Sequence, residues 1–334
     1  MNQNKSTGMN KNLRVRIKNV ILKTPLLTSS GTSGSRDEIN LMQNRNKILA
    51  SLGAFVTKGV SINESLGNKE PRIVEVRSGI LNSIGLQNKG VRKFFEEDVP
   101  ELRKYELPVV VNISASSVSE FGELSERILN YNTHSIIKGI EINVSCPNIK
   151  KGGAAFGADP LLVEQVVKEV KSKVHDSLCI ITKLSPNVTD ITQIGKAAIN
   201  GGTDALSMIN TLRGMAIDVH SGMPVLGNQI GGLSGPCIKP VGVYMVFECF
   251  RKIPECSRKE IPIVGIGGIS NCSDALEYIL AGATAVGIGT QWFINNTIFE
   301  DIHKDLATYL RKNNETIENL IGKAHGHSFK KIPC

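Results

Sequence analysis

The sequence predicts an α/β protein of the (β/α)8 TIM-barrel class, with an N-terminal strand extension and insertions at one rim. Eight short apolar, strand-like segments recur along the 334 residues. Segments with helical periodicity lie between them, which is typical of parallel strands joined by helices. The strands are apolar throughout, as expected where helices cover both faces of a sheet. A doubly wound open sheet is the alternative architecture.

The elements follow one another in regular order. The expected strands occupy residues 25–30, 54–60, 107–114, 139–145, 178–184, 205–210, 262–267 and 283–289. The expected helices occupy residues 37–49, 118–130, 160–174, 189–200, 238–251, 272–281 and 298–312. Residues 13–20 alternate with period two, which predicts a further strand that caps the barrel. Residues 61–106 and 212–237 are long connections, so we expect rim loops carrying a lid and ligand contacts.

These boundaries give a single TIM-barrel domain over residues 13–325, between a disordered basic and polar tail at 1–12 and a second tail at 326–334. A hydrophobic content of 41% is enough for a large core and argues against global disorder. The seven cysteines are scattered without a C-x-x-C pair, so we expect neither a metal site nor a disulfide framework. This usage fits the reducing cytoplasm.

The formal net charge of +8 raises the question of nucleic-acid binding. The basic residues are spread along the chain and aromatic residues make up only 5%, so we expect no nucleic-acid partner. No run of 18 apolar residues occurs, so we expect no transmembrane helix. The first 23 residues contain six basic residues and no acid, as in a mitochondrial presequence. Their period-two alternation favours a strand instead.

A barrel places its chemistry just after each strand, at the C-terminal rim. The most informative rim segment follows the fourth strand, where Pro147 ends the strand and Cys146 is delivered between two carboxamides, Asn143 and Asn148. Every other strand also ends in a polar residue or glycine. These residues are Ser30, Gly31, Lys58, Gly59, Asn112, Lys183, Asn210, Thr211, Gly267, Gly268, Gly289 and Thr290.

Glycine-rich turns follow the last two strands, at residues 264–270 and 286–290. Such turns let backbone N–H groups approach a phosphate, and the loops after strands seven and eight are a frequent phosphate site in barrels. Either turn alone is weak, because glycine at a helix entrance is often only steric. Lys58 and Lys183 lie in or at the end of apolar strands. They either extend their ammonium groups to the surface or face an electron-rich ring or carboxylate. The phosphate and lysine features together indicate FMN.

Cys146 is the expected general base, because an ordinary thiol has a pKa near ~8.5 and a modest depression makes it useful at neutral pH. The six histidines include no rim signature, so we interpret them as structural or solvated. No Ser/His/Asp set stands out.

With these residues the chain resembles class 1 dihydroorotate dehydrogenases over roughly residues 13–325. Nine segments carry the resemblance in family order. They are residues 57–59, 67–72, 82–88, 143–148, 183–187, 208–211, 231–236, 265–268 and 287–290. The respiratory class 2 enzymes use a serine as base and usually have an N-terminal membrane helix. Here a cysteine stands in that place.

The resemblance implies that Cys146 takes a proton from C5 of dihydroorotate while C6 passes hydride to FMN. The implied FMN ligands are Ser30, Lys58, Gly59, Asn112, Asn143, Lys183, Ile209, Gly235, Gly267, Gly268, Gly289 and Thr290. The implied ligands of dihydroorotate and orotate are Lys58, Asn82, Ser83, Ile84, Gly85, Leu86, Asn143, Asn148, Asn210 and Thr211.

Residues 149–153, Ile-Lys-Lys-Gly-Gly, resemble class 1B, whose members use NAD through a partner subunit carrying FAD and a [2Fe–2S] cluster. The resemblance also implies a homodimer. Class 1A, which uses fumarate, is the alternative. The chain departs from the family pattern at Ser83, at residues 60–63 and in its basic N-terminal tail. These departures affect fine tuning and the partner surface.

Two further functions remain alternatives. A reductase of another pyrimidine, like dihydropyrimidine dehydrogenase, would carry histidine where Asn148 stands, so this asparagine favours orotate. A non-catalytic phosphate- or nucleotide-binding barrel would use the glycine turns without needing Cys146 as a base.

Overall fold

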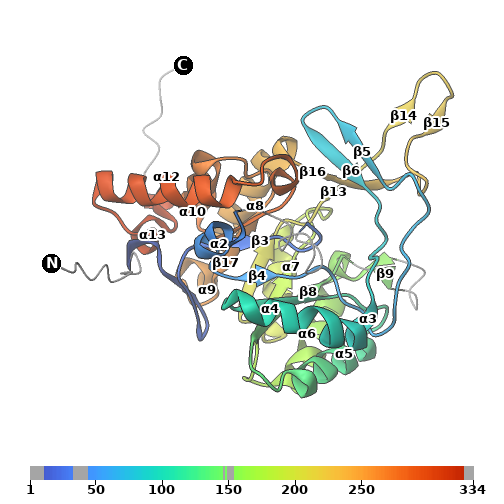
Figure 1. Ribbon diagram of the computed structural model, residues 1–334, viewed down its shortest axis with the longest axis horizontal. Helices are drawn as coiled ribbons and strands as arrows, with labels where there is room; N and C mark the ends of the chain where they lie inside the picture. Colours follow the sequence, from blue (N-terminus) through green and yellow to red (C-terminus); the bar gives the residue numbers. More distant parts are fainter. Residues whose placement is uncertain (1–10, 33–43, 146, 149–153, 327–334) are drawn as a thin grey trace.

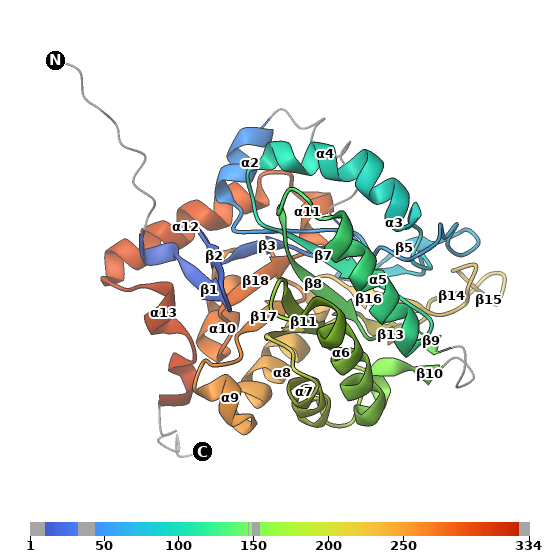
Figure 2. The same ribbon diagram turned by 90° about the horizontal axis from the view of Figure 1, so that it is seen from below.

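Eight parallel strands form a closed barrel surrounded by helices (Figures 1 and 2). The computed structural model describes residues 11–32, 44–145, 147–148 and 154–326. In chain order the barrel strands are β3 (Leu26–Thr28), β4 (Phe55–Val56), β7 (Val109–Ile113), β8 (Ile137–Asn143), β11 (Cys179–Lys183), β12 (Ala205–Met208), β17 (Ile263–Ile266) and β18 (Ala285–Ile288). Each overlaps one of the eight predicted segments, and only β8 begins outside its segment, two residues earlier than predicted.

The barrel closes in two places. The last strand pairs with the first through Val286 and Leu26, and a parallel bridge between Leu27 and Ala54 joins β3 to β4. An open doubly wound sheet would leave two unpaired edges, so the alternative architecture is excluded. The predicted TIM barrel is confirmed.

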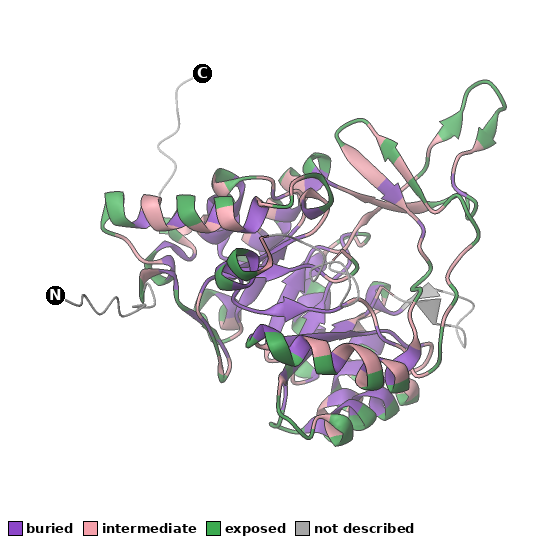
Figure 3. Cartoon of the chain, in the orientation of Figure 1, coloured by how far each residue is buried: buried purple, intermediate pink, exposed green. Residues whose placement is uncertain are grey.

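The helices that surround the barrel are amphipathic. They are α2 (Arg45–Ser51), α5 (Val118–Tyr131), α6 (Pro160–Val174), α7 (Ile191–Asn200), α8 (Lys239–Lys252), α10 (Cys272–Ala281) and α12 (Ile298–Asn313). In α6, Val163, Val166, Val167 and Val170 recur at helical spacing and are fully buried. The burial map shows this inward apolar face around buried strands (Figure 3). Short helices complete the chain: η5 (Phe156–Ala158), η6 (Pro236–Ile238), α9 (Pro254–Ser257), α11 (Gln291–Ile294), α13 (Ile317–Leu320) and η7 (Lys323–Gly326).

Local capping explains where several of these helices begin. The Ser117 hydroxyl accepts the Glu120 N–H at the start of α5, and Asn271 accepts the Asp274 N–H at the start of α10. Asp159 caps α6 directly before Pro160. The start expected for the first helix, residue 37, lies outside the described residues; within them α2 begins at Arg45.

The N-terminal extension is a hairpin rather than the predicted single strand. After a short helical turn, η1 (Lys11–Leu13), strand β1 (Val15–Ile17) pairs antiparallel with β2 (Val20–Leu22). The chain reverses at Lys18, where φ is 51°. Lys18 bridges Asp176 and Asp204, and these two carboxylates fix the turn against the barrel.

The connection after β4 contains a helix that we expected to be a loop. It comprises α3 (Gly90–Lys93), the π-helical turn η2 (Phe94–Asp98), α4 (Val99–Leu102) and η3 (Arg103–Tyr105). Phe94, Val99 and Leu102 are buried against the barrel, which supplies the covering helix of this βα unit. Four short segments, with changing hydrogen-bond register and Pro100 near the start of α4, blur the helical periodicity in the sequence.

Two insertions from distant parts of the chain form one antiparallel sheet above the rim (Figure 1). From the first come β5 (Ile73–Val76) and β6 (Gly79–Asn82), and from the second β13 (Leu212–Gly214) and β16 (Gly231–Ser234). Pairing of Leu81 with Leu233 joins the insertions. A hairpin of β14 (Ile217–Asp218) and β15 (Met223–Pro224) projects further, while β9 (Pro147–Asn148) pairs with β10 (Ala154–Ala155) at the rim. Among the described residues no helix is long and apolar enough to cross a membrane.

Candidate active site

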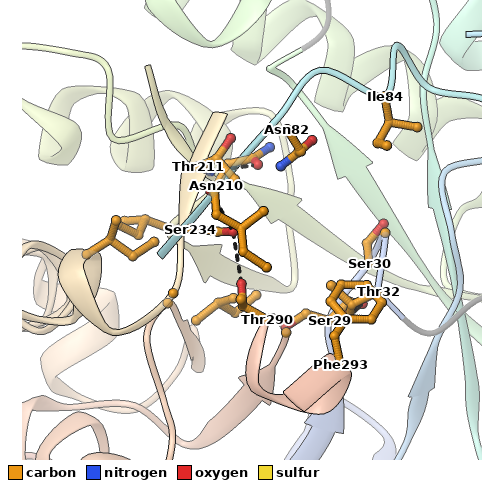
Figure 4. Close-up of a pocket in the computed structure, with 18 of the residues that line it drawn as sticks. Ser29, Ser30, Thr32, Asn82, Ile84, Asn210, Thr211, Ser234, Thr290 and Phe293 are labelled. Carbon is orange, nitrogen blue, oxygen red and sulfur yellow. Dashed lines mark hydrogen bonds between the residues drawn. The ribbon is translucent and has the colours of Figure 1, made fainter. Parts of the chain in front are cut away.

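A cavity of about 580 Å³ lies at the rim where the barrel strands end (Figure 4). Each barrel strand supplies a lining residue at or just beyond its C-terminal end, and strands β5, β6 and β16 of the rim sheet supply more. A volume in this range fits a cofactor with its substrate. The position is the one where barrel enzymes place their chemistry.

The twelve residues expected to bind the cofactor all line this cavity. They are Ser30, Lys58, Gly59, Asn112, Asn143, Lys183, Ile209, Gly235, Gly267, Gly268, Gly289 and Thr290. Of the residues expected at the substrate, Lys58, Asn82, Ile84, Leu86, Asn143, Asn210 and Thr211 line it too.

The other expected substrate residues have different outcomes. Ser83 and Gly85 are not part of the cavity wall: Ser83 is buried, and Gly85 packs on Asn68. The reason is the strand-like alternation of this segment, which turns Asn82 and Ile84 inward. Cys146 and the side chain of Asn148 lie outside the described residues.

Carboxamides gather at one end of the cavity, beside the point where β8 ends (Figure 4). Asn210 donates from Nδ2 to Asn143 Oδ1 at 3.2 Å and to Ser145 Oγ at 3.0 Å. Its Oδ1 accepts the backbone N–H of Thr211 at 2.8 Å. Asn82 reaches the same end from β6, held by a bond from Nδ2 to the Gly232 carbonyl. Because these groups both donate and accept, they suit the amide edges of a planar heterocycle.

Glycines line the opposite end, after β17 and β18. Gly268 has φ +68°, and a Cβ there would lie 2.8 Å from the Gly235 carbonyl oxygen and 2.9 Å from the Lys239 nitrogen. Only glycine fits this conformation and this close approach without strain. The Thr290 hydroxyl donates a hydrogen bond to Ser234 Oγ at 2.9 Å, which ties the rim sheet to the loop after β18 (Figure 4). The bare backbone and nearby hydroxyls are suited to a phosphate.

The two cavity lysines differ in their surroundings. Lys183 is buried, and its Nζ lies 3.8 Å from Glu141 Oε2. Lys58 is half-buried, and no carboxylate in the described part of the chain forms an ion pair with it. The sequence places both lysines alike, in or at the end of apolar strands, and the structure distinguishes them by their acidic neighbours. Lys58 is the cation available to an anionic ligand.

Two residues that line the cavity have buried polar atoms without a hydrogen-bond partner. Ser29 Oγ and Asn112 Oδ1 are buried without a hydrogen-bond partner, although buried polar groups are nearly always paired. Together with the glycine turns and Lys183, they fit a flavin mononucleotide whose ring carries donors and acceptors and whose tail ends in phosphate.

The described thiols lie elsewhere. Cys179, Cys237, Cys249, Cys256 and Cys272 are free, and none lines the cavity. Burial raises the pKa of Cys179 and of Cys256 to about 12, and it also raises the pKa of Cys249. Groups so hard to ionise are poor bases at neutral pH. No histidine of the described residues lines the cavity, and no His/Cys/Asp/Glu group among them could hold a metal ion.

Several lining residues escaped the sequence reasoning. Ser29, Thr32, Ser234 and Phe293 belong to the cavity wall. Ser234 lies within residues 231–236, one of the segments that carry the family resemblance, and Ser29 directly precedes Ser30. Their position next to predicted site residues is the sequence feature that could have identified them. Glu141, whose Oε2 lies 3.8 Å from Lys183 Nζ, is recognisable in the sequence only as a charged residue within an apolar strand.

Comparison with known proteins agrees with this arrangement. The family model for dihydroorotate dehydrogenase matches residues 12–310. The catalytic subunit of dihydroorotate dehydrogenase B (NAD(+)) from Caldicellulosiruptor bescii is 44% identical over 312 residues, covering 93% of this chain and 98% of that protein. The corresponding subunit from Desulforamulus reducens is 45% identical over 318 residues, covering 95% of this chain and 100% of that protein.

Among solved structures, the dihydroorotate dehydrogenase of Eimeria tenella in complex with ferulenol superposes with a TM-score of 0.76. It is 20% identical and covers 96% of this chain and 90% of its own, so the likeness concerns the fold. The family model and the B-type relatives are stronger evidence of family membership, because their matches extend over nearly the whole sequence. The chain belongs to the dihydroorotate dehydrogenase family, in its class 1B branch.

Proposed function

We propose that this chain is a catalytic subunit that oxidises (S)-dihydroorotate to orotate in pyrimidine biosynthesis, using bound FMN. The observation that carries the proposal is one cavity, in a member of this family, that joins a glycine-lined end to a carboxamide-lined end. The glycine end is assigned to the FMN phosphate, and the carboxamide end to the substrate.

The chain's own residues divide the work. Lys58 pairs with the substrate carboxylate, because it is the half-buried cation without an acidic partner among the described residues. Asn82, Asn143 and Asn210 hold the amide edges of the pyrimidine. The hydrogen bond between Asn210 and Asn143, and that from Asn82 to the Gly232 carbonyl, fix their orientation before substrate arrives. The side chains of Ile80 and Ile84 add apolar surface to the cavity wall.

Oxidation removes a proton from C5 and a hydride from C6, and a C5=C6 double bond forms. FMN, held by the glycine end of the cavity, would supply the hydride acceptor. Cys146, in its thiolate form, takes the C5 proton and later releases it to solvent. Ser145, the preceding residue, accepts a hydrogen bond from Asn210, so the backbone entering Cys146 is tied to the substrate-binding carboxamides.

The direct test is to purify the chain and measure bound flavin and dihydroorotate oxidation with a dye as acceptor. We expect a yellow protein with one FMN per chain and turnover of dihydroorotate well above that of dihydrouracil. A colourless protein that takes up no added FMN would contradict the proposal. Preference for dihydrouracil would favour the dihydropyrimidine alternative.

The proposed final acceptor is NAD, reached through a partner subunit that carries FAD and a [2Fe–2S] cluster. The curated relatives are named as catalytic subunits of NAD(+) enzymes, which supports a second subunit. Phe293 lines the cavity and is 58% exposed, and the adjacent Ile294 is 67% exposed. Exposed apolar side chains beside a redox cavity suit a protein that must approach the cofactor.

Replacing Ile294 by aspartate should therefore reduce NAD-linked turnover of the co-purified complex by about tenfold or more, since a charge in an apolar contact costs about 1.4 kcal/mol or more. Dye-linked turnover should stay unchanged. Steady-state assays with both acceptors make the comparison. Ile21→Asp is the matched control, because Ile21 is an exposed isoleucine on the N-terminal hairpin. Equal loss with both acceptors would argue against a docking role, and fumarate-linked activity of the chain alone would favour class 1A.

We further propose a cytoplasmic homodimer. Burial of free thiols such as Cys179 and Cys249 supports a reducing compartment. Exposed apolar residues on the projecting hairpin, Ile217, Val219 and Met223, support self-association. Light scattering of the purified chain gives its stoichiometry.

A further inference from the structure

Glu141 is a buried carboxylate inside the barrel. It occupies the middle of β8 between Ile140 and Ile142, and it is 3% exposed. It does not line the cavity. Burying a carboxylate is costly unless its oxygens are hydrogen-bonded or paired with a cation, so its partners indicate why the charge is tolerated.

Three other barrel strands supply those partners: β7 and β11, which flank β8, and β12 beyond β11. Asn112 of β7 donates from Nδ2 to Oε2 at 2.7 Å, and Ser207 of β12 donates to Oε1 at 2.8 Å. Lys183 of β11 places Nζ 3.8 Å from Oε2. Two of the three partners, Asn112 and Lys183, line the cavity. Glu141 thus contacts two polar residues of the cavity wall without lining the cavity itself.

Only one of the two cavity lysines has its positive charge offset by a carboxylate. Lys183 has Glu141 at ion-pair distance, whereas Lys58 has no such partner in the portion of the chain described. Both ammonium groups would attract negative charge on a ligand. With Glu141 in place, the Lys183 pair contributes little net charge to the cavity.

We propose that Glu141 is a positioning residue that holds Lys183 and Asn112 in the cavity wall and offsets the lysine charge, and that it would thereby lower the reduction potential of FMN bound in the cavity. The inference rests on the proposed function. Reduction adds electron density to the flavin, so a lone ammonium favours it and an adjacent carboxylate opposes it. A lower potential suits an enzyme that passes its electrons onward to NAD.

The test is the reduction potential of FMN in the purified holoprotein, measured by spectroscopic titration against reference dyes. Glu141→Gln keeps the shape and removes the charge. At a fixed solution potential we expect the ratio of reduced to oxidised flavin to rise about tenfold in this variant. For a two-electron couple that corresponds to an increase of about 30 mV in the reduction potential. Glu141→Asp keeps the charge and loses a methylene, so its potential should stay close to that of the unmodified protein.

A purely structural role predicts the reverse order, because aspartate leaves a space that glutamine fills. Glu248→Gln is the matched control. Glu248 is also buried, but its partners Arg251 and Lys252 belong to α8, so removing its charge should leave the potential unchanged.

The lysine gives a second, independent arm. Lys183→Met should lower the potential, because it leaves Glu141 uncompensated. The double variant Glu141→Gln/Lys183→Met removes both charges and should return towards the unmodified value. Replacing a buried pair by neutral groups is also well tolerated by folding.

Three results overturn the inference: an unchanged potential in Glu141→Gln, equal shifts in the glutamine and aspartate variants, or a double variant no higher in potential than Lys183→Met. The last comparison decides the matter should Glu141→Gln not fold. Failure of the unmodified protein to bind FMN would contradict the proposed function, which is a different outcome.

Discussion

Replacing Cys146 by serine is expected to lower dihydroorotate turnover at pH 7 by about 10²–10⁴-fold, the usual contribution of a positioned general base. A serine hydroxyl is a much weaker acid than a thiol, so far less of it is in the basic form at neutral pH. The remaining activity should rise steeply with pH. Single-turnover bleaching of the flavin by dihydroorotate measures the effect on the chemical step directly.

Two observations keep this experiment decisive. Orotate should still bind, as seen by its perturbation of the flavin spectrum, because Lys58 and the carboxamides are untouched. Cys272→Ser is the matched control, since Cys272 lies on α10 outside the cavity wall and burial raises the pKa of its thiol to about 11. A loss in Cys146→Ser of no more than about tenfold means that another group takes the proton.

Replacing Gly268 by valine should weaken FMN binding by at least about 100-fold, or about 2.7 kcal/mol. A β-branched residue is strained at φ +68°, and its Cβ would meet the Gly235 carbonyl and the Lys239 backbone within 3 Å. Relief of that contact moves the loop away from the phosphate. Fluorescence titration of the apoprotein with FMN gives the dissociation constant.

Gly222 provides the control for backbone strain. It has the same φ of +68°, but a Cβ there meets nothing within 4 Å. Gly222→Val should therefore share the conformational cost and leave FMN affinity unchanged. Equal affinities for the two variants would show that the glycine turn after β17 is not the phosphate site.

The barrel is predictable from sequence because each strand is a short apolar run flanked by helical patterns. Residues 160–174, for example, are predicted and observed as a helix with the same boundaries. The cavity residues are predictable for a related reason: parallel strands bring residues such as Asn112 and Lys183 to one rim whatever their separation in sequence.

What escaped prediction depends on long-range pairing or on local geometry. The rim sheet pairs β6 with β16, and neither short segment contains a sequence feature that predicts its pairing partner. The helix after β4 is divided by a π-helical turn, which disrupts the 3.6-residue period. The role of Glu141 is not predictable from its own apolar strand, because its partners Asn112, Ser207 and Lys183 lie on three other strands.

The rim sheet also affects when the site can form during synthesis. Asn82 bonds to the Gly232 carbonyl 150 residues further along the chain, and the barrel closes only when Val286 of β18 pairs with Leu26 of β3. At translation rates of about 5–20 residues per second, β16 is synthesised roughly eight to thirty seconds after β6. During this interval the nascent chain lacks the cavity-wall residues that come from β16, β17, β18 and the loops after them. Cofactor capture is therefore a late event, and truncated chains should leave the ribosome without flavin.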